Sequence, residues 1–311
     1  MNEQLPPGFR SDFIICDGIK LHLVHNGAAY DGKPLDDPRQ PVLMLHGFPE
    51  FWIAWESVMA ELGDDYLILA PDQRGYNKSD APQGAEYYKA KLLVSDMVTL
   101  TQTVLGNRSF VLCGHDWGAS IAYALAINFP EKVSNLLIAN GVHPVCFQRA
   151  MIDHPAQAKA SAYFHILRSE SAAAHMAAND FAKTFSMFEK FSVTPWLDET
   201  MKERYRKAWD GPERLGAMLH WYNSSPIVVP VEGETVPDAP LYHVGPDQFR
   251  ISMPHTLVWG TGDQALLPAA HAGLEAFCDD LTRVEIEGAD HWVLHTHGPQ
   301  VAEAVRMLAG R

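Results

Sequence analysis

Short apolar segments alternate with longer amphipathic segments along most of the chain. Short runs with few polar residues are typical of strands that a parallel sheet buries on both faces, and apolar residues spaced three or four apart are typical of helices. The predicted strands are residues 12–16, 20–25, 41–45, 66–70, 109–113, 133–139, 253–259 and 283–286. The predicted helices are residues 51–62, 88–105, 119–126 and 299–310. This alternation predicts an α/β fold with a doubly wound, mostly parallel sheet, which begins with a hairpin turned at Asp17-Gly18.

The alternation stops in the middle of the chain. Residues 143–249 contain no convincing buried strand, and Ala, Met, Phe, Trp and Tyr recur there at helical spacings. The strand pattern returns at residues 253–259. We therefore predict an α/β core made of residues 1–142 and 250–311, with residues 143–249 inserted as a helical cap, or lid. The length of 311 residues suits one large α/β domain with such an insertion.

Charge and cysteine content narrow the choice of partners and compartment. The formal net charge is −14, and no cluster of Lys and Arg offsets it, which argues against nucleic acid and anionic membranes as partners. No apolar run is long enough to span a bilayer. The four cysteines are far apart, and the first residues do not resemble a signal peptide, so we expect a cytoplasmic protein. We therefore expect the binding partner to be a small molecule. The sequence leaves the oligomeric state open, and a homodimer is among the arrangements it allows.

The motif Gly114-His115-Asp116-Trp117-Gly118 carries the most specific chemical information. It reads as the G-x-S-x-G turn that presents a nucleophile between a strand and a helix, with aspartate in place of serine. A predicted strand precedes it and a predicted helix follows it. A carboxylate needs no base to act as a nucleophile, and it can displace a leaving group from a saturated carbon to leave an ester on the protein.

Hydrolysis of such an ester needs an activated water and an oriented imidazole. Asp263 follows the strand at 253–259, and His291 follows the strand at 283–286, in the chain order nucleophile, acid, histidine. Both lie on loops at the same sheet edge as Asp116. Asp290 and Asn140 compete with Asp263 as the group that orients the histidine.

Other residues near these motifs have more ordinary interpretations. His295 and His297 compete with His291, but we expect them on a solvated turn, farther from the strand end. We expect Asp72 and Arg74 to form an internal ion pair, and Ser120 to point away from the cavity.

A second turn, His46-Gly47-Phe48-Pro49, follows the strand at 41–45. The backbone N–H groups of Phe48 and Trp117 are expected to form an oxyanion hole. The sequence His295-Thr296-His297 lacks a third metal ligand at a useful spacing, and Gly260-Thr261-Gly262 lacks the third glycine of a dinucleotide loop. We therefore expect neither a metal nor a cofactor.

Taken in order, these motifs resemble those of the α/β-hydrolase fold family and, within it, the soluble epoxide hydrolases. The matching segments are HGFPE (46–50), DQRGY (72–76), GHDWG (114–118), WGTGD (259–263) and His291. The resemblance runs from about residue 13 to near the end of the chain, and it implies an α/β-hydrolase fold with an inserted cap.

The resemblance also implies a function for the cap. Similar epoxide hydrolases use two cap tyrosines to hold and protonate the epoxide oxygen, and the segments around Tyr163 and Tyr222 match theirs. An opened epoxide leaves as a strongly basic alkoxide that needs an acid, whereas a halide does not. The implied activity is the conversion of an apolar aryl or alkyl epoxide and water to a vicinal diol, through an ester on Asp116. The expected pocket walls are Phe48, Trp52, Trp117, Phe164, Phe185, Phe188 and Trp221.

Two alternatives remain. Haloalkane dehalogenases share the aspartate but typically carry asparagine where Phe48 stands, and haloacetate dehalogenases typically place arginine at or just after the position of Trp117, where residues 117–121 offer none. The other alternative is a ligand receptor built on a hydrolase fold, which would bind a ligand without turnover.

Overall fold

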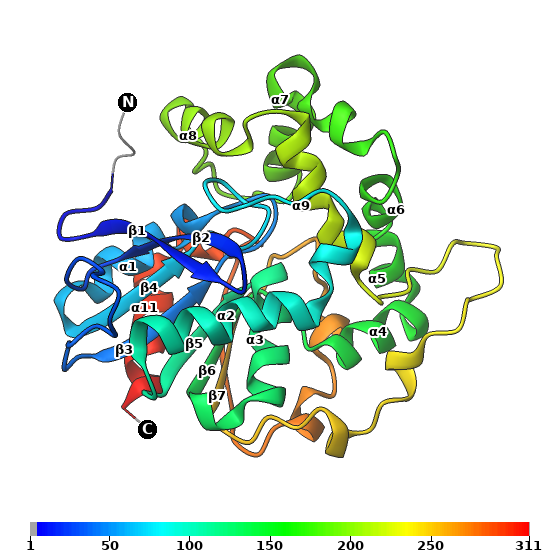
Figure 1. Cartoon of the computed structure of the whole chain (residues 1–311). Coiled ribbons are helices and arrows are strands. Elements are labelled where there is room, and N and C mark those ends of the chain that lie inside the picture. The colour runs from blue at the N-terminus through cyan, green and yellow to red at the C-terminus, as the bar shows by residue number, and fades with distance from the viewer. Residues whose placement is uncertain (1–4, 311) are drawn as a thin grey trace.

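The computed structural model describes residues 5–310 of the chain. Within these residues, eight strands form one sheet in the spatial order β1-β2-β4-β3-β5-β6-β7-β8 (Figure 1). The strands are β1 (Arg10–Cys16), β2 (Ile19–His25), β3 (Gln40–Leu45), β4 (Tyr66–Pro71), β5 (Phe110–His115), β6 (Val133–Ala139), β7 (His255–Gly260) and β8 (Leu281–Ile286). The β1–β2 and β2–β4 pairs are antiparallel, and the other neighbouring strands are parallel. The predicted α/β fold and hairpin are confirmed.

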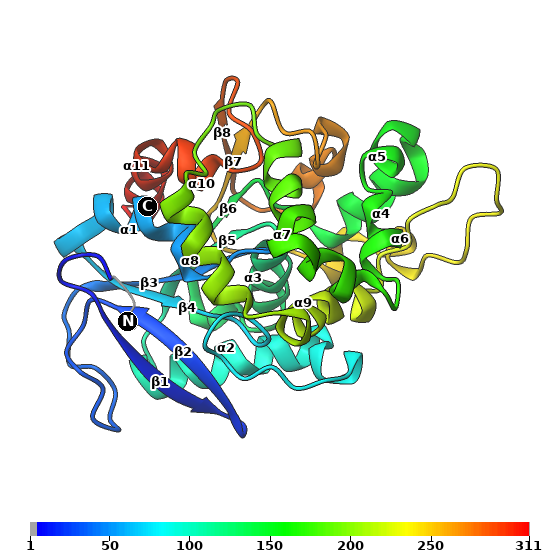
Figure 2. The same cartoon turned by 90° about the horizontal axis from the view of Figure 1, so that it is seen from above.

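Helices cover both faces of the sheet (Figure 2). On one face α1 (Glu56–Leu62) packs against α11 (Gly298–Ala309), and on the other face α2 (Ala90–Leu105) packs against α3 (Trp117–Asn128). The predicted helix at 51–62 is divided, because its first turn is the 3₁₀ helix η1 (Trp52–Trp55). The strands between these layers are apolar because both of their faces are buried: the side chains of β3 from Val42 to Leu45 are fully inaccessible to solvent.

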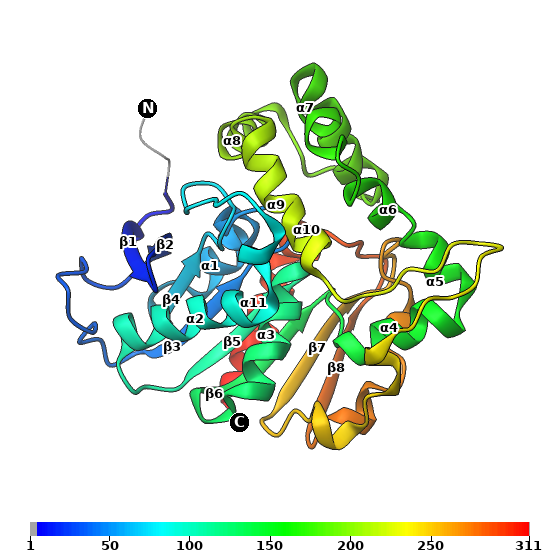
Figure 3. The ribbon, with the colours of Figure 1, turned by 45° about the vertical axis from the view of Figure 1, so that its right-hand side comes forward.

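The helical segment between β6 and β7 lies over one edge of the sheet (Figures 1 and 3). Residues 140–250, all of them described, contain helices and loops and no strand. The helices are α4 (Pro144–Asp153), α5 (Pro155–Ala160), α6 (Tyr163–Leu167), α7 (Ala172–Lys190), α8 (Glu199–Trp209) and α9 (Pro212–Ser224). The assignment of residues 143–249 to a separate lid domain stays a prediction. Among residues 5–310, no helix combines the length and the apolar character needed to cross a bilayer.

The ends of the parallel strands bring distant loops together. The last residues of neighbouring strands are in register, with Leu45 beside Gly114, His115 beside Ala139, and Gly260 beside Ile286. The loops that follow β3, β5, β6, β7 and β8 therefore start at one edge of the sheet. This is the edge at which open α/β sheets place their binding sites.

Gly118, at the start of α3, permits the close contact between this helix and the end of β3. A Cβ atom at this position would lie 2.2 Å from the carbonyl oxygen of Leu45, and this backbone atom cannot rotate away. We predict that Gly118→Ala lowers the free energy of unfolding by about 1–3 kcal/mol, measured by urea denaturation.

Gly245→Ala is the matched control for this substitution. No atom lies within 4 Å of a Cβ built at Gly245. Its effect should therefore stay within about 0.5 kcal/mol. Equal stabilities of the two variants would show that the helix contact tolerates a methyl group.

Candidate active site

Asp116 occupies a sharp turn between β5 and α3. Its backbone has φ 50° and ψ −120°, a conformation that side-chain-bearing residues rarely adopt. The loop after β3 approaches it closely at Gly47, where a Cβ atom would lie 2.3 Å from the Cβ of Asp116. This approach lets the backbone N–H of Phe48 donate a hydrogen bond of 2.8 Å to Oδ1 of Asp116. The side chain of Asp116 is 15% exposed, so the carboxylate remains accessible.

His291 lies between two carboxylates. Its Nε2 is 3.5 Å from Oδ2 of Asp116, and its Nδ1 is 2.8 Å from Oδ2 of Asp263. The other oxygen of Asp263 accepts hydrogen bonds from the backbone N–H groups of Ala265 and Leu266. Asp263 is thus held as an acceptor, and His291 Nδ1 must be the donor in this pair. The structure brings together Asp116, Asp263 and His291 from three different loops.

The two competing orienting groups have other positions. Asn140 donates from Nδ2 to Oδ2 of Asp263 at 2.8 Å, so it supports the acid instead of replacing it. Asp290 accepts hydrogen bonds from the backbone N–H groups of Val193 and Trp292. Asp290 is therefore used to anchor the helical segment to the loop that carries the histidine.

The pKa of His291 lies well above its usual value. Burial acts to lower the pKa, but the negative charges of Asp263 and Asp116, with hydrogen bonds to both, outweigh that effect. For Asp263, burial acts to raise the pKa, and the charge and hydrogen bond of His291 overcome it and keep the pKa low. This raised pKa favours the imidazolium form of His291, which lies between the two carboxylates.

Tyr163 of α6 and Tyr222 of α9 lie near enough to Asp116 for its charge to act on both hydroxyls, and of the two only Tyr163 lines the cavity that opens at Asp116. Burial raises the pKa of both hydroxyls well above the usual value, and the negative charge of Asp116 raises both further. A hydrogen bond with the Trp117 side chain partly offsets this effect at Tyr222. The ring centroids of the two tyrosines are 6.4 Å apart, and that of Tyr222 is 5.1 Å from Phe48. Both hydroxyls are therefore protonated donors in the field of the Asp116 carboxylate.

Trp117 is the first residue of α3, so its backbone N–H is one of the groups that a helix leaves without an internal acceptor. This position suits the predicted oxyanion role of that N–H, which stays a prediction. The Phe48 N–H already has its acceptor on Asp116.

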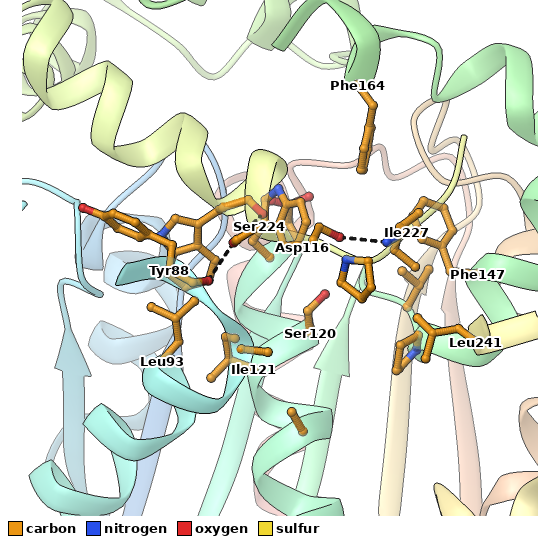
Figure 4. Close-up of a pocket in the computed structure, with 18 of the residues that line it drawn as sticks. Tyr88, Leu93, Asp116, Ser120, Ile121, Phe147, Phe164, Ser224, Ile227 and Leu241 are labelled. Carbon is orange, nitrogen blue, oxygen red and sulfur yellow. Dashed lines mark hydrogen bonds between the residues drawn. The ribbon is translucent and has the colours of Figure 1, made fainter. Parts of the chain in front are cut away.

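A cavity of about 300 Å³ opens at Asp116 (Figure 4). Its walls include Tyr163 and the predicted wall residues Trp117, Phe164 and Trp221.

The prediction is wrong for the four other aromatic walls, of which Phe48 packs its ring edge-on against Tyr222 and does not line the cavity. Trp52 lies under the guanidinium of Arg204, at 5.7 Å, instead of lining this cavity. Phe185 packs against Trp209. Phe188 is fully buried, and its ring centroid lies 4.6 Å from that of Trp292. These rings hold the cap helices α7 and α8 against the core.

The predicted ion pair between Asp72 and Arg74 is also wrong. Arg74 makes a bidentate pair with Asp96 of α2, at 2.8 and 2.6 Å. Asp72 instead contacts the His22 Nδ1 at 2.7 Å and accepts from the Trp52 backbone N–H. Asp72 and Arg74 therefore have different partners, although they are only two residues apart on this turn.

Two further expectations need correction. Ser120 does not point away from the cavity but lines it (Figure 4). His295 is not on a solvated turn: its side chain is 7% exposed, and its Nε2 lies 2.6 Å from Oε1 of Glu50.

Glu50 is a buried carboxylate that the sequence analysis did not single out as functional. It accepts a hydrogen bond of 2.9 Å from the Tyr205 hydroxyl on α8, and its Oε2 lies 3.4 Å from Nδ1 of His115. The other nitrogen of His115 lies 2.9 Å from the backbone oxygen of His291. Burial acts to raise the pKa of Glu50, but the positive charge of His295 and the other histidine contacts keep it low. In the sequence, the signal that points to Glu50 is an acidic residue directly after the turn His46-Gly47-Phe48-Pro49.

The fold, together with the cluster of Asp116, Asp263 and His291, indicates the class of protein to which the chain belongs. Residues 40–298 match the model of the α/β hydrolase fold family. The chain belongs to that family.

The chain is similar over most of its length to several known proteins. It is 31% identical to the AB hydrolase superfamily protein YfhM of Bacillus subtilis, over 93% of each chain. It is 31% identical to epoxide hydrolase 4 of mouse, over 79% of this chain and 64% of the relative. Among solved structures, a Bacillus megaterium epoxide hydrolase in complex with an inhibitor superposes with a TM-score of 0.83 at 26% identity, over 96% of this chain and all of that one. The chain therefore resembles the epoxide hydrolases within the family.

The charge of Asp116 should control the protonation of His291. Asp116→Asn removes the negative charge beside Nε2, so we predict that the pKa of His291 falls and that the imidazolium loses its proton at lower pH. Titration of nitrogen-15-labelled histidine by NMR measures this shift. The exposed control Asp238→Asn should leave the titration unchanged. An unchanged His291 pKa in Asp116→Asn would contradict the ion pair.

Proposed function

We propose that this protein is an epoxide hydrolase, which converts an apolar aryl or alkyl epoxide and water to a vicinal diol through an ester on Asp116. The supporting observation is that two protonated tyrosines, Tyr163 and Tyr222, lie in the field of the same carboxylate that His291 contacts. The similarity to proteins named epoxide hydrolases supports the same reading.

In the first step, Oδ2 of Asp116 attacks a carbon of the epoxide ring. Oδ1 is the oxygen that accepts the Phe48 N–H, so it becomes the carbonyl oxygen of the ester. The bond between that carbon and the ring oxygen breaks as the new bond forms, and one tyrosine donates its proton to the leaving oxygen. The second tyrosine keeps that oxygen hydrogen-bonded.

In the second step, His291 accepts a proton from water, and the hydroxide attacks the carbonyl carbon of the ester. Before this, alkylation has removed the charge of Asp116, which together with Asp263 raises the pKa of His291, and the imidazolium has passed its proton to the tyrosinate left by ring opening. The Phe48 and Trp117 N–H groups stabilise the negative charge on the tetrahedral oxygen, an effect worth about 3–4 kcal/mol per donor. Collapse of this intermediate expels the diol, whose departing oxygen takes the proton from His291, and the carboxylic acid left at Asp116 then gives its proton to His291, which restores the starting site.

The fate of the water oxygen tests the ester. We predict that, in oxygen-18 water with enzyme in excess over styrene oxide, the first turnover gives unlabelled diol and places the label in the peptide that contains Asp116. Mass spectrometry measures both products. Label in the diol and none in the peptide would instead indicate direct attack of water on the ring.

The same incubation separates the alternatives. A short haloalkane and fluoroacetate are offered beside styrene oxide. Halide without diol would identify a dehalogenase, and saturable binding without any product would identify a receptor.

The cap tyrosines should be needed for ring opening. We predict that Tyr163→Phe combined with Tyr222→Phe lowers the rate of ester formation from an epoxide by about 10²–10⁴-fold, because no acid remains to protonate the alkoxide. Stopped-flow measurement of the intrinsic tryptophan fluorescence follows the single turnover.

Tyr87→Phe is the control, because this tyrosine is 44% exposed. Its rate should match that of the wild type. A near-normal rate in the double variant would remove both tyrosines from the mechanism.

A further inference from the structure

One side of helix α3 forms the floor of the cavity that opens at Asp116. The helix residues that line the cavity recur at spacings of three, one, three, three and one, which keeps them on one face from the first turn to the last. They are Trp117, Ser120, Ile121, Ala124, Ile127 and Asn128. Four of these six are only partly buried, and Asn128 is exposed. The cavity is therefore a groove that starts at the carboxylate and follows the helix to its far end.

The opposite walls of the groove come from three other segments. Leu93 of α2 lies on one side, and Phe147 of α4 lies on the other (Figure 4). Ile227, Leu241 and Phe249, from the segment that joins α9 to β7, complete the wall beside α4. All of these side chains are apolar, so the groove can desolvate an apolar ligand along its length.

The lining also limits the charge of an occupant. Asp116 is the only charged side chain that lines the groove among residues 5–310. No lysine or arginine among these lining residues could balance a carboxylate or a phosphate within it. From Ser120 to Asn128 the helix rises by about 12 Å, so the apolar path is long compared with the ring of a small epoxide.

We propose that this groove holds a long, unbranched and uncharged alkyl tail of the substrate, laid along α3 with the epoxide at Asp116 and the far end at Asn128. This proposal rests on the proposed epoxide hydrolase function and names its substrate class. Continuity with the reacting carboxylate favours a substrate tail over a separate ligand. The small side chains Ser120 and Ala124 keep the floor of the groove low enough for a methylene chain.

The length of the tail is the variable to test. The terminal epoxides of butene, hexene, octene and decene present the same reacting ring with increasing alkyl chains. We expect kcat/KM to rise along this series, by about fourfold at most for each buried methylene and by at least about tenfold overall. In Ala124→Trp, the indole fills the middle of the groove, and the ratio of kcat/KM for decene epoxide to that for butene epoxide should fall by about tenfold or more.

Ala174→Trp is the matched control, because it places the same side chain at an exposed position on α7. Its ratio should equal that of the wild type. If Ala124→Trp does not fold, Ile127→Glu tests the same path, since a carboxylate near the far end opposes a long tail. A flat series in the wild type, or an unchanged ratio in the groove variant that folds, would overturn the proposal.

A binding measurement separates this proposal from the proposed function. Decanol and butanol are titrated against the intrinsic fluorescence of the wild type, because Trp117 and Trp221 both line the cavity. Tighter binding of decanol that Ala124→Trp weakens supports the alkyl groove even if no epoxide is turned over, and in that case only the proposed function fails. Equal binding of the two alcohols, with epoxide turnover intact, would overturn the groove and leave the proposed function in place.

Discussion

The charge balance around His291 is the constraint on which the rest of the site depends. Its imidazole lies between Asp116 and Asp263, and its positive charge keeps the pKa of the buried Asp263 carboxyl low, although burial acts to raise it. In the proposed reaction, this arrangement also sets the order of the steps. The charge of Asp116 adds to that of Asp263 in raising the pKa of His291, and an ester on Asp116 would remove its share, so that the imidazole can release its proton and then accept one from water.

The fold supports this balance through close backbone approaches. The absence of a side chain at Gly47 lets the loop after β3 reach Asp116, and the same absence at Gly118 lets α3 begin directly against β3. One hydrogen bond, from the Phe48 N–H to Oδ1, then fixes which carboxylate oxygen faces His291. The nucleophile is oriented by main-chain atoms, which do not change rotamer during the reaction.

Buried polar contacts connect the cap to this edge of the sheet. Glu50 joins the loop after β3 to Tyr205 on α8, and Asp290 joins the loop of His291 to the backbone of Val193. Each contact satisfies a carboxylate that burial would otherwise destabilise, so the cap cannot separate from the core without exposing or breaking these pairs. The position of the cap tyrosines above Asp116 is therefore tied to the same loops that position the histidine.

These contacts explain how far the sequence could predict the site. Strand ends are set by apolar runs, so the meeting of Asp263 and His291 at one sheet edge followed from the pattern alone. The ion-pair partner of Arg74 depends on the rotamer of its side chain, and the packing of Phe188 depends on how the cap helices dock on the core. The spacing of apolar residues along the sequence contains neither kind of information. The expectation for Ser120 is wrong because the spacing from Asp116 does not show which side of α3 the cavity covers, and no residue pattern predicts the groove along this helix. In the proposed reaction, the cap brings the acid to the epoxide ring, and the outer face of a core helix gives the remainder of the ligand its path.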